Sequence, residues 1–535
     1  MAKNIIFYLI SLIFFSLLVL SQSLPLSTRG RWIVDSKTGQ RVKLSCVNWA
    51  SHAQSMLAQG LDKRPLKDLA NDIISRDFNC VRLTWSTHMF TRYSHMTIVD
   101  VLDDLDIQNV KSGVQTHNPE MLNMTVAHAF KTVVDGLGNA GLMIVLDNHI
   151  SQPRWCCSLD DGNGFFGDRH FDALEWLQGL DYVARNFTGH SQVIGMSLRN
   201  ELRGPYTNMD NWYKYVSNGS HLIHTKNPNL LVIISGVTFD TDLSFLKEKP
   251  LGYNLHNKVV LEAHLYPFSG SEKLPESKFV KKPLNVVCNQ VKEKFEREAG
   301  FVVNMENEPY PLWLSEFGYD LRGDNKAQNR FMSCFLAHIV GKDLDWAYWA
   351  FQGTYMYRQG QESVDEAFGI MDSTWTKDRN PQLNQMLQLA KRINQDPNSN
   401  ASMSYIILHP VSGQCIRSNG RGGIALGDCL TPTQWTYSGD GSSMKLLSNG
   451  QCLKSAGDGK PPVVSTECSG EESKWTMASK AKLQLATKSG GEDFCLEKKS
   501  DTKIVVKRCI CLKDELNCFN DPQPQWFKLV PTNVA

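Results

Sequence analysis

Eight side chains of this 535-residue sequence lie at or near the C-terminal ends of successive apolar runs: Arg82, His149, Asn200, Glu201, His264, Tyr266, Glu316 and Trp349. All except Trp349 are polar or ionisable. Two of them, Glu201 and Glu316, are carboxylic acids on separate runs. One protonated and one ionised carboxyl group, facing each other at one site, are what hydrolysis of a glycosidic bond requires. The pattern therefore predicts glycoside hydrolysis.

The other members of the set fit that chemistry. A cation such as Arg82 lowers the pKa of a neighbouring nucleophilic carboxyl group, and Tyr266 holds such a group by a hydrogen bond. Asn200 is placed to bind the 2-hydroxyl of the sugar, a contact that strengthens in an oxocarbenium-like transition state. Trp349 offers an apolar face to a sugar ring.

The apolar runs themselves indicate the scaffold. They do not alternate between polar and apolar residues, as expected for strands buried on both faces. The opening segment GRWIVDSKTGQRVKLSCVNW is read as a hairpin that turns at Lys37–Gly39 and leads into a first strand. Seven more strands are predicted at 79–85, 142–149, 193–201, 230–236, 259–266, 311–318 and 344–352. Helices are expected between them at 66–76, 127–140, 171–186, 212–224 and 326–340.

Eight strands alternating with helices predict an α/β fold of the (β/α)8 TIM-barrel type, in which catalytic groups lie at the C-terminal ends of the strands. An open doubly wound sheet is the alternative, and the sequence lacks the glycine fingerprint expected of it. The dipeptide Asn307–Glu308 resembles Asn200–Glu201 but precedes Pro309 and the seventh run, which places it at the opposite end of the barrel.

Residues 30–395 resemble glycoside hydrolase family 5, the cellulase family of clan A. The resemblance is carried by the eight residues in their order, by the opening hairpin, and by the contexts SLRNE and LSEFG. It implies that Glu201 is the acid/base, that Glu316 is the nucleophile, and that the anomeric configuration is retained. In combination with the C-terminal region, the chain resembles a plant branch of the family.

A different region follows the linker QDPNSNASMS. It contains three units of about 40 residues, each with a cysteine pair and a closing tryptophan: Cys415, Cys429 and Trp435; Cys452, Cys468 and Trp475; Cys495, Cys509 and Trp526. One disulfide in each unit would compensate for its small core. An insertion in the third unit adds a further expected bridge, Cys511–Cys518.

Residues 405–535 resemble a ricin B-type β-trefoil lectin. That family usually has an aspartate two residues after the first cysteine of each repeat, where this chain has Arg417, Lys454 and Glu497. The glutamine of its Gln-x-Trp motif is replaced by Thr433, Ser473 and Pro524. The resemblance implies an all-β trefoil fold, and we expect at most weak sugar binding, near Glu497.

Several features predict export. Lys3 precedes an apolar run from Ile5 to Leu20, which predicts a cleaved signal peptide at residues 1–23, with an uncleaved signal anchor as the alternative. The 14 cysteines are an even number, and disulfides persist in oxidising compartments. Four N-glycosylation sequons begin at Asn123, Asn186, Asn218 and Asn400. A secreted protein, extracellular or in the cell wall, is expected.

The predicted organisation is therefore a signal peptide (1–23), a hydrolase domain (24–395), a linker (396–404) and a lectin-like domain (405–535). The net charge of +1 provides no basic surface for nucleic acid. No zinc-type spacing or Gly-x-Ser-x-Gly elbow is present, so no metal or cofactor is expected. The adjacent Cys156 and Cys157 form either one bridge or two bridges with other cysteines.

The predicted partner is a polysaccharide or oligosaccharide of the β-glucan or β-mannan class, hydrolysed by a monomer with no membrane contact after signal cleavage. Two alternatives remain: a transglycosylase that uses the same residues, and a catalytically silent carbohydrate-binding protein. Loop aromatics either line sugar subsites or pack the loops: Trp155, Phe165, Phe166, Tyr206 and Trp212.

Overall fold

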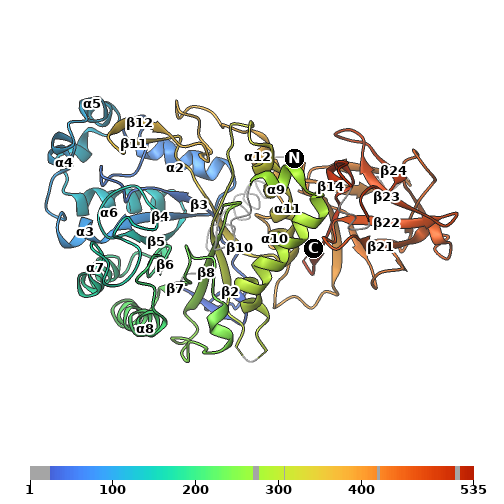
Figure 1. Cartoon of the computed structure of the whole chain (residues 1–535), viewed down its shortest axis with the longest axis horizontal. Coiled ribbons are helices and arrows are strands. Elements are labelled where there is room, and N and C mark those ends of the chain that lie inside the picture. The colour runs from blue at the N-terminus through green and yellow to red at the C-terminus, as the bar shows by residue number, and fades with distance from the viewer. Residues whose placement is uncertain (1–24, 269–275, 307, 419–421, 513–517, 535) are drawn as a thin grey trace, which may run out of the picture.

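The computed structural model describes residues 25–268, 276–306, 308–418, 422–512 and 518–534 (Figure 1). The predicted signal peptide and the decoy residue Asn307 lie outside these ranges. In the described part of the chain, no helix is both long enough and apolar enough to cross a bilayer.

Eight parallel strands close into a barrel in the order β10-β3-β4-β5-β6-β7-β8-β9. Their bounds are β3 Ser45–Trp49, β4 Cys80–Ser86, β5 Met143–Ile150, β6 Val193–Ser197, β7 Leu231–Ser235, β8 Val259–Leu265, β9 Leu312–Phe317 and β10 Asp345–Tyr348. Every one of these strands is buried along its whole length. The predicted (β/α)8 fold is confirmed, and the open doubly wound sheet is excluded.

Helices cover the outside of the barrel. They are α2 Leu66–Ser75, α3 Thr87–Thr91, α4 Ile98–Asp104, α5 Gln108–His117, α6 Val126–Asn139, α7 Ala173–Asn186, α8 Met209–Lys226, α9 Glu276–Lys281, α10 Leu284–Glu298, α11 Lys326–Lys342 and α12 Gln382–Met386. Several of these helices begin at a residue whose side chain caps the first turn. At the start of α7, for example, the Asp172 side chain accepts a hydrogen bond from the backbone amide of Glu175. Their apolar faces join one large core cluster with the outward side of the strands.

Two hairpin turns precede the barrel: one that the sequence did not predict, and the predicted one. Strands β1 (Leu26–Arg29) and β2 (Trp32–Asp35) pair through a turn at Gly30 and Arg31, where Gly30 has a φ of +56°. That left-handed conformation favours glycine. The predicted turn at Lys37–Gly39 is confirmed: it brings Val34 opposite Arg41 in an antiparallel bridge, and the Asp35 side chain holds it by accepting the backbone amides of Lys37 and Thr38. Leu26 of β1 and Ile33 of β2 join the apolar cluster inside the barrel.

The region after the linker is all-β. Strands β13 (Ser404–His409) to β25 (Lys528–Thr532) form two antiparallel sheets, an arrangement consistent with the predicted trefoil. Strands β14 to β24 span Gln414–Ser418, Ile424–Gly427, Gln434–Thr436, Ser442–Ser443, Lys445–Leu446, Cys452–Lys454, Val463–Ser465, Lys474–Ala478, Gln484–Ser489, Glu492–Lys498 and Ile504–Arg508. The four predicted cysteine pairs of this region are disulfides.

The closing tryptophans of the three repeats are fully buried but do not share one environment. Trp435 and Trp475 belong to the core of the C-terminal region. Trp526 instead belongs to the same cluster as the barrel helices, and its indole Nε1 donates to Asn285 Oδ1 of α10 at 2.9 Å. The Asn285 amide nitrogen in turn donates to Gln484 Oε1 at 2.8 Å. Figure 1 shows α10 and α11 facing the C-terminal sheets.

This contact generates a stability prediction. Replacing Asn285 by Ala removes the acceptor of the buried Trp526 indole N–H and the donor to Gln484 Oε1, a loss of about 1–3 kcal/mol in the free energy of unfolding. Thermal unfolding of the full chain measures it. Asn289→Ala is the matched control, because Asn289 lies on the same helix and donates to its own neighbour Glu293. Equal losses of stability from the two substitutions would contradict a stabilising role for the contact between Asn285 and the C-terminal region.

Candidate active site

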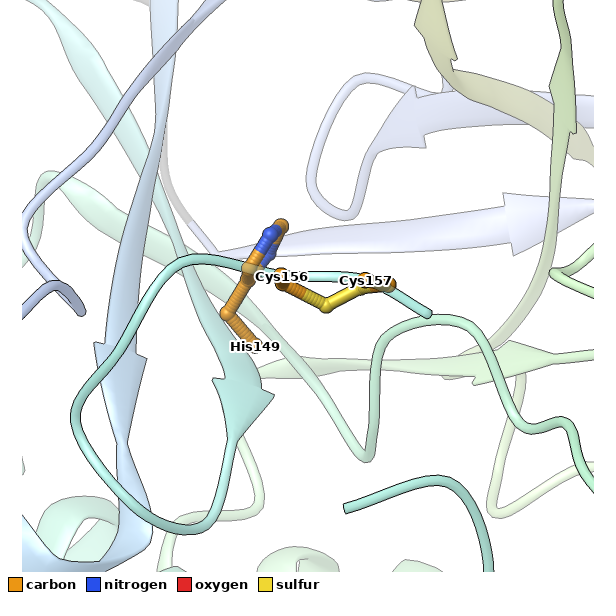
Figure 2. A group of neighbouring side chains, drawn as sticks. All are labelled: His149, Cys156 and Cys157. Atoms are coloured by element: carbon orange, nitrogen blue, oxygen red, sulfur yellow. A yellow bond between two sulfur atoms is a disulfide. The ribbon is translucent and has the colours of Figure 1, made fainter. Parts of the chain in front are cut away.

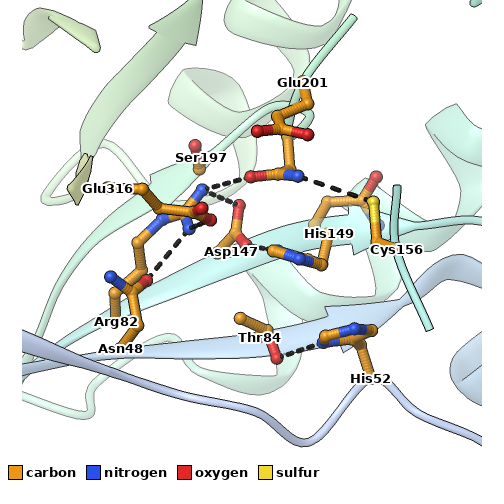
Figure 3. A network of polar contacts seen from close by, with 12 residues as sticks. Asn48, His52, Arg82, Thr84, Asp147, His149, Cys156, Ser197, Glu201 and Glu316 are labelled. Atoms are coloured by element: carbon orange, nitrogen blue, oxygen red, sulfur yellow. Dashed lines mark hydrogen bonds and ion pairs between the residues drawn. The ribbon is translucent and has the colours of Figure 1, made fainter. Parts of the chain in front are cut away.

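All eight predicted residues lie at the C-terminal end of the barrel, four of them labelled in Figure 3. Arg82 is in β4, His149 in β5, His264 in β8 and Glu316 in β9, while Tyr266 and Trp349 come directly after β8 and β10. Asn200 and Glu201 lie beyond the end of β6 at Ser197, so the fourth strand is shorter than predicted. The backbone N–H of Asn200 nevertheless donates to the backbone carbonyl of Asn148 in β5 at 2.9 Å, which fixes this segment to the C-terminal end of the barrel.

Arg82 is the centre of the site. Its fully buried guanidinium lies 2.6 Å from Glu316 Oε1, 2.9 Å from Asp147 Oδ1 and 3.7 Å from Glu262 Oε2. Burial alone would lower the pKa of Arg82, but the three carboxyl groups outweigh it and raise the pKa. A second donor reaches Glu316 from the other side, because the Tyr266 hydroxyl donates to Oε2 at 3.0 Å. The two donors bind opposite oxygens and so fix the orientation of the carboxylate.

Glu201 has a different environment. Its Oε1 lies 3.0 Å from Nδ1 of the buried His264, and its side chain retains 13 % exposure against 6 % for Glu316. Its backbone has a φ of +46°, a left-handed conformation that is rare for a side chain with a Cβ. Such strain persists only where surrounding structure imposes it, and it clusters at functional sites. Here Arg203 donates to the Glu201 carbonyl at 2.7 Å.

The two glutamates face each other. A carboxylate oxygen of Glu201, one of Glu316 and a ring nitrogen of His264 all lie within 4.8 Å of one another. Burial raises the pKa of each carboxyl group to about 7, opposed by Arg203 and Arg82 for Glu201 and by His264 and Arg82 for Glu316. With both pKa values near neutrality, the pair is poised to hold one proton between two carboxyl groups.

Sequence reasoning missed three buried acids beneath this pair. Asp147 and Glu262 contact Arg82, and the Asp240 carboxylate lies 3.6 Å from His264 Nε2. Burial raises the pKa of all three. Asp147 and Glu262 were detectable in principle, because each is a single charge inside an apolar run that otherwise reads as a buried strand. Asp240 carries no such signal, since it lies in the loop after β7.

His149 and Trp349 form a wall of the site. His149 Nδ1 lies 2.7 Å from Asp147 Oδ2, within hydrogen-bonding distance, and burial holds the pKa of His149 well below its usual range. The half-buried Trp349 ring stacks on His149 with centroids 5.5 Å apart and an interplanar angle of 15°. His149 therefore supports one face of the Trp349 ring.

Comparisons with known proteins show the family. The model of the cellulase family, glycosyl hydrolase family 5, matches residues 36–354. A protein of Chamaecyparis obtusa described as a glycosyl hydrolase 5 family protein is 39% identical over 535 residues, covering 96% of this chain and 94% of that protein. The chain belongs to glycosyl hydrolase family 5. It is a glycoside hydrolase acting on O-glycosyl bonds, of the EC 3.2.1 class.

Solved structures of other hydrolases share the fold. The endocellulase of Pyrococcus horikoshii superimposes with a TM-score of 0.56 at 18% identity, covering 69% of this chain and 100% of that one. The catalytic domain of the major endoglucanase of Xanthomonas campestris pv. campestris gives 0.55 at 21% identity, covering 68% and 99%.

The loop aromatics of this family 5 hydrolase divide into two groups. Phe165, Phe166 and Trp212 are buried and pack the loops and helices. Trp155 is half-buried, with the Arg358 guanidinium 4.3 Å above its ring, and Tyr206 is 58% exposed. Only the last two have ring surface available to a ligand.

The vicinal cysteines form one bridge. Cys156 and Cys157 are joined to each other in the loop after β5, near His149 (Figure 2). Their two sulfur atoms and a His149 nitrogen lie close enough together to suggest a metal site, but disulfide sulfurs are not thiolate ligands. Two further disulfides, Cys46–Cys80 and Cys288–Cys334, complete the set, so every cysteine of the chain is paired.

The raised pKa of Glu201 generates a prediction for pH-dependent stability. A carboxyl group whose pKa rises on folding from about 4.3 to about 7 stabilises the fold below pH 4, and that stability is lost as the pH rises through 7. Glu201→Gln removes the ionisation. The variant should gain stability over the native chain between pH 5 and pH 8, by up to about 3 kcal/mol.

Thermal unfolding at the two pH values measures this difference. Glu120→Gln is the control, because Glu120 is exposed on the surface of the short helix Pro119–Asn123. A Glu201→Gln variant whose stability relative to the native chain is the same at pH 5 and pH 8 would contradict the assigned pKa direction.

Proposed function

We propose that this protein is a secreted retaining β-glycosidase that cleaves a β-linked polysaccharide of the β-glucan class, with Glu201 as acid/base and Glu316 as nucleophile. The observation that carries the proposal is the approach of the Glu201 and Glu316 carboxylate oxygens to within 4.8 Å. Retaining enzymes have carboxyl groups about 5–5.5 Å apart, whereas inverting enzymes leave about 6.5–9.5 Å for a water molecule.

The assignment of roles follows from the partners of each carboxyl group. Glu316 accepts from Arg82 and Tyr266, and donors of this kind favour its ionised form. In the first step, a Glu316 oxygen attacks the anomeric carbon while Glu201 gives its proton to the departing glycosidic oxygen. In the second, Glu201 takes a proton from water, the water oxygen bonds to the anomeric carbon, and the bond to Glu316 breaks.

Two observations support the substrate class and the compartment. Relatives include an endoglucanase of Paenibacillus polymyxa and a major extracellular endoglucanase of Xanthomonas campestris, at 21% and 22% identity. Seven disulfides pair all 14 cysteines, and the four sequon asparagines are exposed. Both features suit export through an oxidising compartment, and we place the mature protein, a monomer, outside the cell.

The C-terminal region contributes little sugar binding in this proposal. Arg417 and Lys454, which replace the expected aspartates, pair with Asp428 and Glu467 at 3.3 and 3.4 Å. Glu497 is half-buried, and one of its oxygens accepts from Gln525 at 2.9 Å. Of the three residues that replace the aspartates, only Glu497 offers an acceptor to a sugar hydroxyl, which leaves one weak site at most among these three positions.

The stereochemical course tests the reaction class. Hydrolysis of a soluble β-glucan oligosaccharide, followed by proton NMR in the first minutes, should show the β-anomer of the new reducing end before mutarotation. The α-anomer appearing first would contradict the proposal. A parallel β-mannan panel tests the substrate, and products longer than the substrate at high concentration would indicate transglycosylation.

Azide rescue tests the two roles. Glu316→Ala should lose activity by about 10⁴-fold or more, because no covalent intermediate forms. Azide should restore turnover with an α-glycosyl azide product. Glu201→Ala should be rescued on an activated aryl glycoside with a β-glycosyl azide product, since its intermediate still forms. The reverse pattern of products would exchange the roles, and full activity in both variants would show that these two residues do not carry the reaction.

A further inference from the structure

The vicinal disulfide Cys156–Cys157 has no counterpart in the chemistry described so far. It lies in the loop after β5, and both cysteines are half-buried rather than enclosed in a core. Cys156 Sγ is 3.9 Å and Cys157 Sγ 3.7 Å from the side-chain amide nitrogen of Asn200. The bridge therefore touches a residue of the active site directly.

The Asn200 amide is held from both ends. Arg82 Nη2 donates to its Oδ1 at 2.9 Å, which decides which end of the amide carries the oxygen. Its NH₂ group consequently faces the two sulfur atoms. Because Arg82 also binds Glu316, the orientation of Asn200 is linked to that of the proposed nucleophile.

The sulfur atoms are themselves fixed in place. The buried Arg203 donates to the Ser158 carbonyl, directly after the disulfide, at 2.8 Å and pairs with Asp161 in the same loop. Asp161 also accepts the Ser158 amide at 3.1 Å. The same Arg203 binds the carbonyl of Glu201, so the disulfide loop and the catalytic segment share one anchor.

Disulfide sulfur is chemically suited to this position. It is a weak acceptor and has no hydrogen to donate. A carbonyl or carboxylate in its place would take the Asn200 N–H as a full hydrogen bond, and a substrate hydroxyl would have to displace it. Two sulfurs at 3.7–3.9 Å confine the amide without competing for its hydrogens.

We propose that the Cys156–Cys157 disulfide is a positioning element that holds the Asn200 amide toward the 2-hydroxyl of the sugar undergoing cleavage. This inference rests on the proposed glycosidase function. In this proposal the disulfide acts through Asn200. Removing the disulfide therefore weakens the contact between Asn200 and the 2-hydroxyl, which is made mainly in the transition state.

A double-mutant cycle with a modified substrate tests the proposal. One substrate is 4-nitrophenyl β-cellobioside, and the other lacks the 2-hydroxyl on the glucose that carries nitrophenol. The kcat/KM for 4-nitrophenyl β-cellobioside divided by that for the 2-deoxy substrate measures how much the 2-hydroxyl contributes to catalysis in each protein. The proteins compared are the native chain, Asn200→Ala, the pair Cys156→Ala/Cys157→Ala, and the control pair Cys511→Ala/Cys518→Ala, which removes a disulfide of the C-terminal region.

The expected result is a ratio about 5-fold lower in Cys156→Ala/Cys157→Ala, the loss of roughly one well-placed hydrogen bond. It should fall mainly through kcat and approach the ratio of Asn200→Ala. The control pair should keep the native ratio. If removing the Cys156–Cys157 bridge leaves the ratio unchanged, or if the control pair lowers it equally, the proposal is overturned. A native chain inactive on both substrates would instead contradict the proposed action on β-linked glucose.

A second measurement covers the case in which the Cys156→Ala/Cys157→Ala chain does not fold. Native protein is treated briefly with tris(2-carboxyethyl)phosphine, which supplies two electrons to the disulfide and is oxidised to the phosphine oxide with oxygen from water. Alkylation and peptide mass spectrometry identify the bridges opened. Protein reduced at Cys156–Cys157 should show the same lowered ratio, and an unchanged ratio there contradicts the proposal.

Discussion

The site depends on one buried guanidinium. Arg82 is fully enclosed in the barrel and contacts the carboxyl groups of Asp147, Glu262 and Glu316. An isolated buried charge costs several kcal/mol, and a cluster of this kind persists only when each member is bound by others. The carboxyl groups keep Arg82 charged, and Arg82 keeps Glu316 bound and oriented. Removing any one of these side chains leaves the charges of the others buried without a compensating partner.

The same arginine links otherwise separate parts of the barrel mouth. Through Nη1 it holds Glu316 and Asn48, and through Nη2 it holds Asn200. Asn200 lies beside Glu201, whose left-handed backbone turns the chain away from β6. The two proposed catalytic carboxyl groups are thus positioned by one rigid framework instead of by two independent loops. Rigid positioning of this kind lets a site stabilise a transition state without reorganisation.

The barrel was predictable because each strand is buried on both faces and so appears as an unbroken apolar run. A polar residue at the end of an unbroken apolar run stands out in the sequence, and these residues identified the site. Partners across strands were not predictable. Asp147 aligns with Thr84, two residues beyond Arg82 on β4, and that register is a tertiary property. The contact of Trp526 with Asn285 also escaped prediction, because all three repeat tryptophans have equivalent sequence contexts.

The most direct test of this account is covalent trapping of the nucleophile. A 2-deoxy-2-fluoro-β-cellobioside with a good leaving group should form a stable glycosyl ester, since the fluorine slows its hydrolysis more than its formation. Digestion and tandem mass spectrometry then locate the added mass. The account predicts a single label on Glu316, in a protein that loses activity in proportion to labelling. A label on Glu201, or complete inactivation with Glu316 unmodified, would contradict it.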